Sequence, residues 1–230
     1  MAIIPLKPND EYPFSAVPAA ASATPTPTGG LVLIAQPETD WWHTPEPDPA
    51  DRRTGVLYGL PIDGTKDWQC GVWIQGEWGT QYDQGTLMVI AGDDGDNVNF
   101  DWLKTGIELD GGKEWIGCVV ASPWSDWSIA IAPQSTSTLN KDAYSVYIQI
   151  TREGSTLTVR HAFALNPAPT DIPPASELLM MREVKAFNVD ASGAQKSGAG
   201  SKWRIGPMTC GPKNAQGTKA HYEGFTFKYL

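Results

Sequence analysis

Short runs of alternating apolar and polar residues, separated by glycine- and proline-rich turns, constrain the fold of this chain more than any other feature. In residues 143–165 two such runs flank the turn sequence REGS. A period of two is typical of a strand with one buried face, and two runs around a short turn predict a hairpin. No segment shows convincing helical periodicity. We therefore predict an all-β protein built as a two-sheet sandwich or barrel.

Proline, glycine and small polar residues mark where the chain leaves these strands. We predict that residues 1–30 form an irregular N-terminal segment and that residues 43–55, which contain three prolines of the PEPDP type, form a long loop. Residues 166–177 are expected to be irregular, and residues 190–202 to be mobile. With no internal repeat and no sign of a second domain, residues 31–230 are expected to form a single domain.

Charge and composition exclude several classes of function. The net charge of -9 and the lack of a basic cluster argue against binding to nucleic acid or to an anionic membrane. The three cysteines are scattered, which disfavours a disulfide framework or a zinc site. The N-terminus does not resemble a signal peptide, and no apolar run is long enough to span a bilayer. We therefore expect a cytoplasmic protein, and its 10 tryptophans indicate aromatic surfaces in the core or at a ligand site.

Four motifs in chain order resemble a known family. They are YDQGTLMV at residues 82–89, WLKTGIELDGG at 102–112, CVVASPWSDWSIAI at 118–131 and GPMTCGPKNAQGTKAHYEGFTFKY at 206–229. Together with TDWWHTP before them, they are similar to the concanavalin A-like domain of unknown function whose members include the "regulation of enolase" protein. The resemblance implies a jelly-roll sandwich with one concave sheet face. It implies little about activity.

The second motif contains the two main candidate site residues, Lys104 and Glu108. As a strand, it sends Leu103 and Ile107 to one face and Trp102, Lys104 and Glu108 to the other. Gly106 lies between the two charges, and a glycine inside a strand often marks close approach of a ligand or of another backbone. We predict that Lys104 and Glu108 form a pair on the floor of a groove, with room for a ligand above the glycine. The alternative is a pair of solvated charges without a function.

Three further motifs supply the remaining candidates. They are Asp40, Trp42 and His43 in TDWWHTP, Tyr82 and Gln84 in YDQ, and Asp126 and Trp127 in SPWSDWS. A histidine titrates near neutral pH and can shuttle protons, although a lone histidine on a loop is more often a surface residue. The aspartate of SPWSDWS either points into the groove or caps backbone N–H groups in a turn.

No motif predicts a metal ion or another cofactor. The acidic sequence GDDGDN at residues 92–97 lacks the spacing of a calcium loop with its distal glutamate, so a solvated hairpin loop explains it better. No two histidines have the spacing of metal ligands. The chain also lacks the G-x-S-x-G motif of serine hydrolases and a phosphate-binding glycine loop before a helix.

Two functions remain. In the first, Trp42, Trp102 and Trp127 line a groove that binds a sugar-like or planar small molecule, oriented by polar side chains. The family resemblance also allows a regulatory role through a protein partner. In the second, the same groove is the active site of a lyase, isomerase, cyclase or glycoside hydrolase. Its acid and base would come from Lys104, Glu108, Asp126 and His43.

Overall fold

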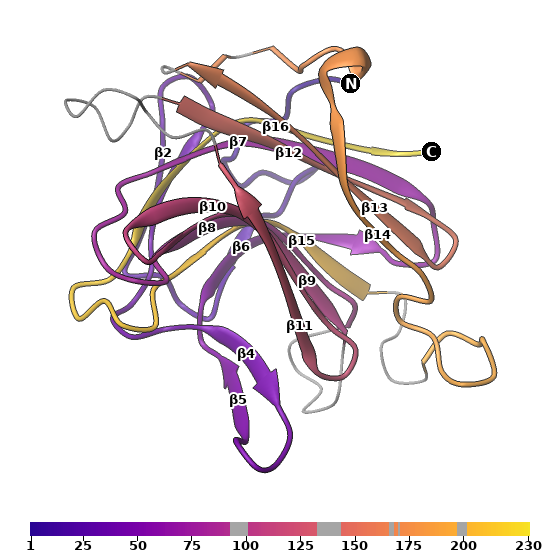
Figure 1. Cartoon of the computed structure of the whole chain (residues 1–230). Coiled ribbons are helices and arrows are strands. Elements are labelled where there is room, and N and C mark those ends of the chain that lie inside the picture. Colours follow the sequence, from indigo (N-terminus) through magenta and orange to yellow (C-terminus); the bar gives the residue numbers. More distant parts are fainter. Residues whose placement is uncertain (93–100, 133–143, 166–167, 170, 197–201) are drawn as a thin grey trace.

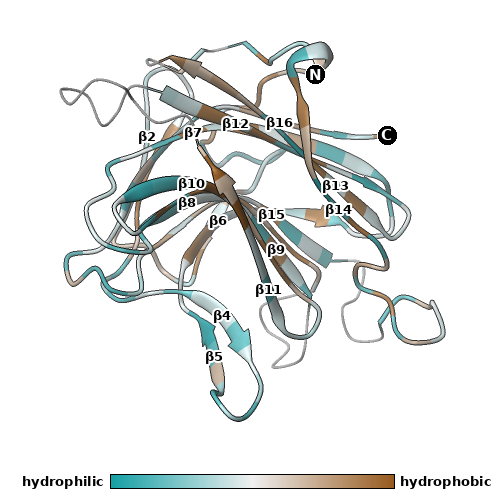
Figure 2. Ribbon diagram, in the orientation of Figure 1, coloured by the Kyte–Doolittle hydropathy of each residue, from teal (hydrophilic) through white to brown (hydrophobic). Residues whose placement is uncertain are grey.

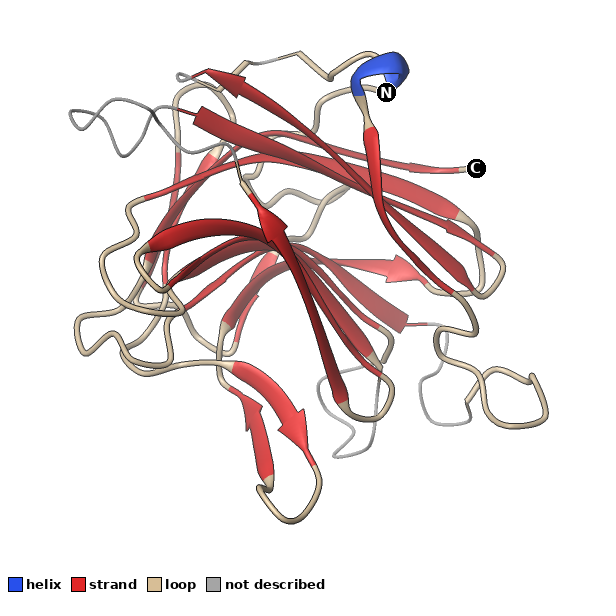
Figure 3. Ribbon diagram, viewed as in Figure 1, coloured by secondary structure: helices blue, strands red, loops and turns tan. Residues whose placement is uncertain are grey.

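Two large antiparallel sheets lie face to face in the protein, and almost all of the regular structure is β-strand (Figures 1 and 3). The computed structural model describes residues 1–92, 101–132, 144–165, 168–169, 171–196 and 202–230. Within these residues each sheet has seven strands. The predicted all-β, two-sheet sandwich is therefore confirmed.

The first sheet, here called the β9 sheet, carries the candidate site. Its strands, in spatial order, are β1 (Ser15–Val17), β6 (Val56–Asp63), β15 (Lys202–Cys210), β8 (Gln84–Ile90), β9 (Trp102–Asp110), β10 (Lys113–Ala121) and β11 (Ser125–Ile131). Neighbouring strands β8, β9, β10 and β11 follow one another in the chain as a meander. The motifs that they carry are thereby brought side by side.

The second sheet, the β7 sheet, packs against the first. Its strands, in spatial order, are β14 (Leu179–Val184), β13 (Thr156–Leu165), β12 (Tyr144–Glu153), β7 (Trp68–Gly76), β16 (Lys219–Tyr229), β3 (Leu31–Ile34) and β2 (Ser22–Pro25). Strands β12 and β13 form the predicted hairpin, with partners from Tyr144–Leu165 to Glu153–Thr156. A single short 3-10 helix, η1 (Ala175–Glu177), is the only helical turn in the described part of the chain.

The core lies between the two sheets, and a smaller apolar cluster lies on the opposite face of the β9 sheet. Strand β9 contributes to both, because its side chains alternate. Leu103 and Ile107 belong to the core, whereas Trp102 packs in the smaller cluster with Trp41 and Met208. The predicted division of this strand into two faces is confirmed. The face that carries Trp102 and Lys104 is the one that the candidate site occupies.

Residues 1–30 differ from the irregular segment that we predicted. They add edge strands β1 and β2, one to each sheet, and bury Ile4, Leu6 and Phe14 in the core. Short edge strands of three or four residues show weak alternation, so small residues and prolines mask them in the sequence.

Residues 43–55 are also not a loop. Most of them belong to a two-stranded hairpin of β4 (Trp41–Thr44) and β5 (Ala50–Arg53), which projects from the body of the protein and is largely hydrophilic (Figures 1 and 2). The three prolines at positions 45, 47 and 49 lie in the turn between the strands, where they remove no hydrogen bond from the ladder. The hairpin is important because its base forms one side of the candidate site.

Residues 190–202, predicted to be mobile, are described at positions 190–196 and 202. In this part Lys196 donates a hydrogen bond to the buried carboxylate of Asp101 at 2.6 Å, which holds the segment against the start of β9. The described residues contain no helix with the length and apolar character needed to cross a membrane. All three cysteines are buried free thiols, at positions Cys70, Cys118 and Cys210.

Candidate functional site

A cavity of about 450 Å³ opens on the outer face of the β9 sheet, beside the base of the β4–β5 hairpin. Strands β8, β9, β10 and β11 form its floor and one wall, and the hairpin and the loop after β15 form the rest. Seven of the ten predicted site residues line it: Asp40, Trp42, Tyr82, Gln84, Lys104, Glu108 and Trp127. The structure thus brings together side chains from four separate sequence motifs.

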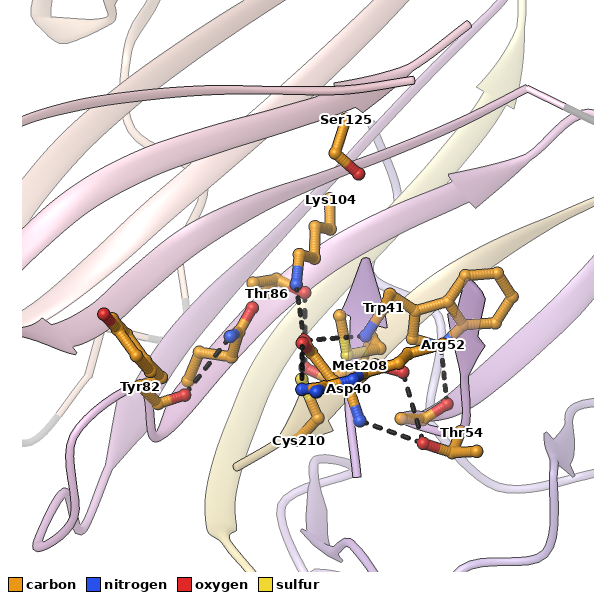
Figure 4. A network of polar contacts seen from close by, with 12 residues as sticks. Asp40, Trp41, Arg52, Thr54, Tyr82, Thr86, Lys104, Ser125, Met208 and Cys210 are labelled. Carbon is orange, nitrogen blue, oxygen red and sulfur yellow. Dashed lines mark hydrogen bonds and ion pairs between the residues drawn. The ribbon is translucent and has the colours of Figure 1, made fainter. Parts of the chain in front are cut away.

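Lys104 forms a buried ion pair at the floor, but its partner is not the one predicted. Its side chain is only 3% exposed, and its Nζ lies 3.3 Å from Oδ1 of Asp40, as Figure 4 shows. We predicted a pair with Glu108, and no such ion pair is present among the described residues. Burial lowers the pKa of Lys104, but the nearby Asp40, Cys210 and Glu108, with the hydrogen bond to Asp40, together outweigh it, so that the pKa lies above its usual value. Lys104 therefore remains charged.

Asp40 is held in place by the base of the hairpin. Its N–H donates to Oγ1 of Thr54 at 3.0 Å, and its carbonyl accepts from the N–H groups of Thr54 and Gly55 at 2.8 and 3.0 Å. The indole of Trp41 donates to the carbonyl of Gly55 at 2.7 Å, and its ring packs edge-on against Trp102. These contacts fix the carboxylate of Asp40 over β9 before any ligand arrives.

Glu108 is the carboxylate without a partner at this site. It is half-buried, and no hydrogen bond to its side chain is found among the described residues. Burial raises its pKa to about 7; Lys104 opposes this rise, while Asp40 and Asp110 add to it. A carboxyl group that is partly protonated near neutral pH can either accept or donate a proton, and an acid or base catalyst needs this property.

Gly106 is required for the close packing of neighbouring backbones. A Cβ atom at this position would lie 2.2 Å from the carbonyl oxygen of Gly85 and 2.7 Å from Cα of Thr86, on the neighbouring strand β8. The hollow that this glycine lines shares Lys104, Glu108 and Trp127 with the cavity and measures only about 10 Å³, close to the lower limit for one water molecule. The space above Gly106 is thus limited to this small hollow, and the larger cavity lies beside it, without Gly106 in its lining.

Trp102 also differs from its predicted role. It is 1% exposed and belongs to the apolar cluster on the same face of the β9 sheet, where Trp41 packs against it, so it does not offer a stacking surface. Its ring lies beside the site, with Nζ of Lys104 5.9 Å from its centroid. The aromatic surface of the cavity comes instead from Trp42, Tyr82 and Trp127.

Tyr82 and Trp127 form an aromatic corner of the cavity. Their rings are perpendicular, with centroids 6.5 Å apart, and Nζ of Lys213 lies 4.9 Å from the centre of the Tyr82 ring. Tyr82 has a φ of 70°, a left-handed conformation that is uncommon for a residue other than glycine. The buried carboxylate of Asp83 stabilises this turn by accepting hydrogen bonds from the N–H groups of residues 79 and 80.

Asp126 and His43 lie outside the cavity lining. The side chain of Asp126 is 71% exposed and pairs with Arg182 of β14 at 2.5 Å, because alternation along β11 turns it away from Trp127. His43 contacts the carbonyl oxygen of Pro123 through Nδ1 at 2.9 Å, since it points opposite to Trp42 along β4. Their predicted acid–base roles at this site are therefore not supported by the geometry.

Two cationic residues in the cavity lining were missed in the sequence. Arg52 lies directly opposite Trp42 in the β4–β5 ladder, and Lys213 lies in the loop after β15. Recognising the hairpin would have identified Arg52 by its register. Lys213 lies within the motif at residues 206–229, but no feature of that motif distinguishes it as a site residue.

No cluster of metal ligands accompanies the site. The described residues contain no group of three or more histidine, cysteine, aspartate or glutamate side chains arranged to hold a metal ion. Residues 93–97 of the acidic sequence GDDGDN fall outside the described residues.

Comparison with known proteins identifies the family. The family model described as "Protein of unknown function (DUF1349)" matches residues 18–229. The chain belongs to this family. The resemblance inferred from the four motifs is thereby confirmed, because a relative of this DUF1349 chain is "Regulation of enolase protein 1" of Saccharomyces cerevisiae. That protein is 29% identical over 111 residues, 45% of this chain and 48% of the relative.

A second relative is the uncharacterized protein AN7484 of Emericella nidulans, 36% identical over 104 residues, 45% of this chain and 50% of the relative. The matched part spans about half the length of both curated relatives. Among solved structures, a functionally unknown protein from Saccharomyces cerevisiae has a TM-score of 0.69 and 21% identity, covering 94% of this chain and 96% of that one.

Carbohydrate-active enzymes also share the fold of this DUF1349 chain. The GH43 protein BlXynB from Bacillus licheniformis has a TM-score of 0.57 at 10% identity, covering 88% of this chain and 33% of that one. An endo-1,3-beta-glucanase catalytic domain from Thermotoga petrophila has a TM-score of 0.50 at 11% identity, covering 92% of this chain and 80% of that one. At such identities the likeness shows the fold alone, a concanavalin A-like jelly-roll sandwich.

Proposed function

We propose that the protein is a ligand-binding module whose cavity takes a sugar-like or planar small molecule. The observation that carries this proposal is a cavity of about 450 Å³ that combines three aromatic side chains with fixed polar groups. Small-molecule sites in proteins are typically concave, about 300–1,000 Å³ in volume, and lined by apolar surface with a few oriented polar groups. A module of this kind would act in regulation by presenting its ligand-bound surface to a protein partner.

The cavity is suited to a flat, polar ligand. Trp42 and Trp127 provide broad apolar faces, and the indole of a tryptophan packs well against the face of a sugar ring or of an aromatic ring. Gln84, Lys104 and Glu108 supply hydrogen-bonding groups on the floor. Because the Asp40–Lys104 ion pair already fixes part of this floor, little ordering is needed when a ligand binds.

The test is a binding survey with tryptophan variants. Isothermal titration with a panel of methyl glycosides and disaccharides should identify a binder, and Trp42→Ala and Trp127→Ala should each weaken it by about tenfold or more, typical of a buried aromatic contact. Trp124→Ala is the matched control, because Trp124 is an exposed tryptophan that packs against His43 outside the cavity lining. Unchanged affinity in both cavity variants would refute the proposal.

The alternative function is an acid–base enzyme that uses the same cavity, and one observation favours it. Glu108 is a carboxyl group without a hydrogen bond among the described residues, it has a pKa of about 7, and it shares the floor with the permanently paired Lys104. A base of this pKa is well matched to removal of a proton at neutral pH, in an elimination, an isomerisation or a cyclisation.

Glu108→Gln separates the two functions. Glutamine retains the size and most hydrogen bonds of the side chain, but it cannot accept a proton as a base. If a substrate found in the binding survey is turned over, this variant should retain binding and lose turnover by about 100-fold or more. Retained turnover would exclude Glu108 as the base, and binding without turnover in the native protein would favour the binding module.

A further inference from the structure

The cavity carries positive charge in a protein that is strongly negative overall. The whole chain has 26 acidic and 17 basic residues, a net charge of -9. Three cationic side chains nevertheless line the cavity, Arg52, Lys104 and Lys213, against two carboxylates, Asp40 and Glu108. A count of three against two gives a formal charge of +1, and protonation of the second carboxylate raises it to +2. The cavity therefore has the opposite sign to the rest of the molecule.

The position of each charge shows which of them is available to a ligand. Asp40 lies between two cations, with Lys104 at 3.3 Å and Arg52 at 3.9 Å, so its negative charge is already neutralised within the site. The guanidinium of Arg52 is 59% exposed and retains hydrogen-bonding capacity beyond this long contact. Lys213 donates to the neutral side-chain amide of Gln81 at 2.7 Å.

Lys213 has no carboxylate partner among the described residues. Apart from its hydrogen bond, its ammonium lies 4.9 Å from the centre of the Tyr82 ring, at the aromatic corner of the cavity. A cation held beside an aromatic surface by neutral groups is well placed to meet a negative charge on a ring that packs there. Arg52 offers a planar, two-pronged donor that matches a carboxylate.

We propose that the ligand of this cavity is an organic anion: a sugar or aromatic ring that bears a carboxylate, with the ring against Trp42 and Trp127 and the carboxylate paired with Arg52 and Lys213. This inference rests on the proposed binding function and specifies its ligand class. The formal surplus of one to two positive charges matches one carboxylate. A neutral ligand would leave this surplus uncompensated.

Two matched pairs of probes test the charge. Methyl β-D-glucuronide and methyl β-D-glucoside differ in having a carboxylate or a hydroxymethyl group, and benzoate and benzamide make the same comparison for an aromatic ring. In titration calorimetry at low ionic strength, we expect the anion of at least one pair to bind at least tenfold more tightly than its neutral counterpart. The pair that shows this preference identifies a sugar acid or an aromatic acid as the ligand.

Variants then assign the preference to its residues. Arg52→Gln and Lys213→Gln should each reduce the ratio of anion affinity to neutral-probe affinity. The double variant should bring this ratio close to one. Arg53→Gln is the matched control, because Arg53 is the next residue on β5, pairs with Asp51 and does not line the cavity. Added salt should weaken the anion more than the neutral probe, since part of its affinity is charge attraction.

The inference is overturned if the neutral probes bind as tightly as the anions, if none of the four binds, or if the double variant keeps the preference. These outcomes differ from failure of the proposed function. That failure would appear in the neutral glycoside panel, as affinity that does not depend on Trp42 and Trp127.

Discussion

Replacing Glu108 by glutamine should stabilise the protein at alkaline pH, which is unusual for a change at a candidate site. The carboxyl group is half-buried, and burial raises its pKa to about 7 from an ordinary value of 4.5. Between these two pH values the folded protein keeps a proton that the unfolded chain releases. The free energy of unfolding therefore falls as the pH rises through this window, since stability declines wherever the folded state binds more protons.

The size of the effect follows from the same two values. The difference between 4.5 and about 7, at about 1.4 kcal/mol for each pH unit, sets an upper bound of about 3.5 kcal/mol. Because the carboxyl group is partly exposed and water relieves some of this penalty, we expect about 2 kcal/mol. Glutamine resembles the protonated form, so Glu108→Gln should match the native protein near pH 4 and exceed its stability by this amount at pH 8.

Urea unfolding at pH 4, 6 and 8, followed by tryptophan fluorescence, measures this difference directly. Glu153→Gln is the control, because Glu153 is an exposed glutamate at the end of β12, and its replacement should change stability by no more than about 0.5 kcal/mol at each pH. The reasoning about this carboxyl group would be refuted if the difference in free energy of unfolding between Glu108→Gln and the native protein did not vary with pH. It would also be refuted if the variant were less stable than the native protein at pH 8.

Two further changes test the floor of the cavity. Asp40→Asn should destabilise the protein by about 3–5 kcal/mol, because it leaves the buried ammonium of Lys104 without its anion. Adding Lys104→Met should restore much of this loss. Equal stability of the single and double variants in urea unfolding would contradict this expectation. Gly106→Ala should cost about 3 kcal/mol or more, since the new methyl group would meet backbone atoms of β8, whereas Gly79→Ala, with no heavy atom within 4 Å, should change the melting temperature little.

Much of the sheet that carries the site follows from local sequence pattern. The alternation of Leu103 and Ile107 with Trp102 and Lys104 correctly assigned the two faces of β9, because a strand with one face in the core must repeat every second residue. On β11 the same alternation turns Asp126 away from Trp127, although we proposed both residues for the groove. The alternation alone did not distinguish Lys104, which lines the cavity, from Trp102, which faces the same way but does not.

The contacts that complete the cavity are distant in the chain, and local pattern cannot reveal them. Lys104 pairs with Asp40, 64 residues earlier, because the hairpin base crosses the sheet at that point. The hairpin itself was mistaken for a loop, since its prolines lie in the turn and its strands have only four residues each. Glycine was interpreted correctly as a sign of close approach at Gly106, but the approaching group is the backbone of β8.

The ten tryptophans offer the most direct test of the central claim, that the cavity is a binding site. Each indole N–H gives its own signal in a proton–nitrogen NMR spectrum, assigned by replacing one tryptophan at a time. Titration with methyl β-D-glucuronide or benzoate should shift the indole signals of Trp42 and Trp127, which line the cavity, and leave those of Trp68 and Trp203 in the core unchanged. Signals that all remain in place, or that shift in the core and not in the cavity, would contradict the account.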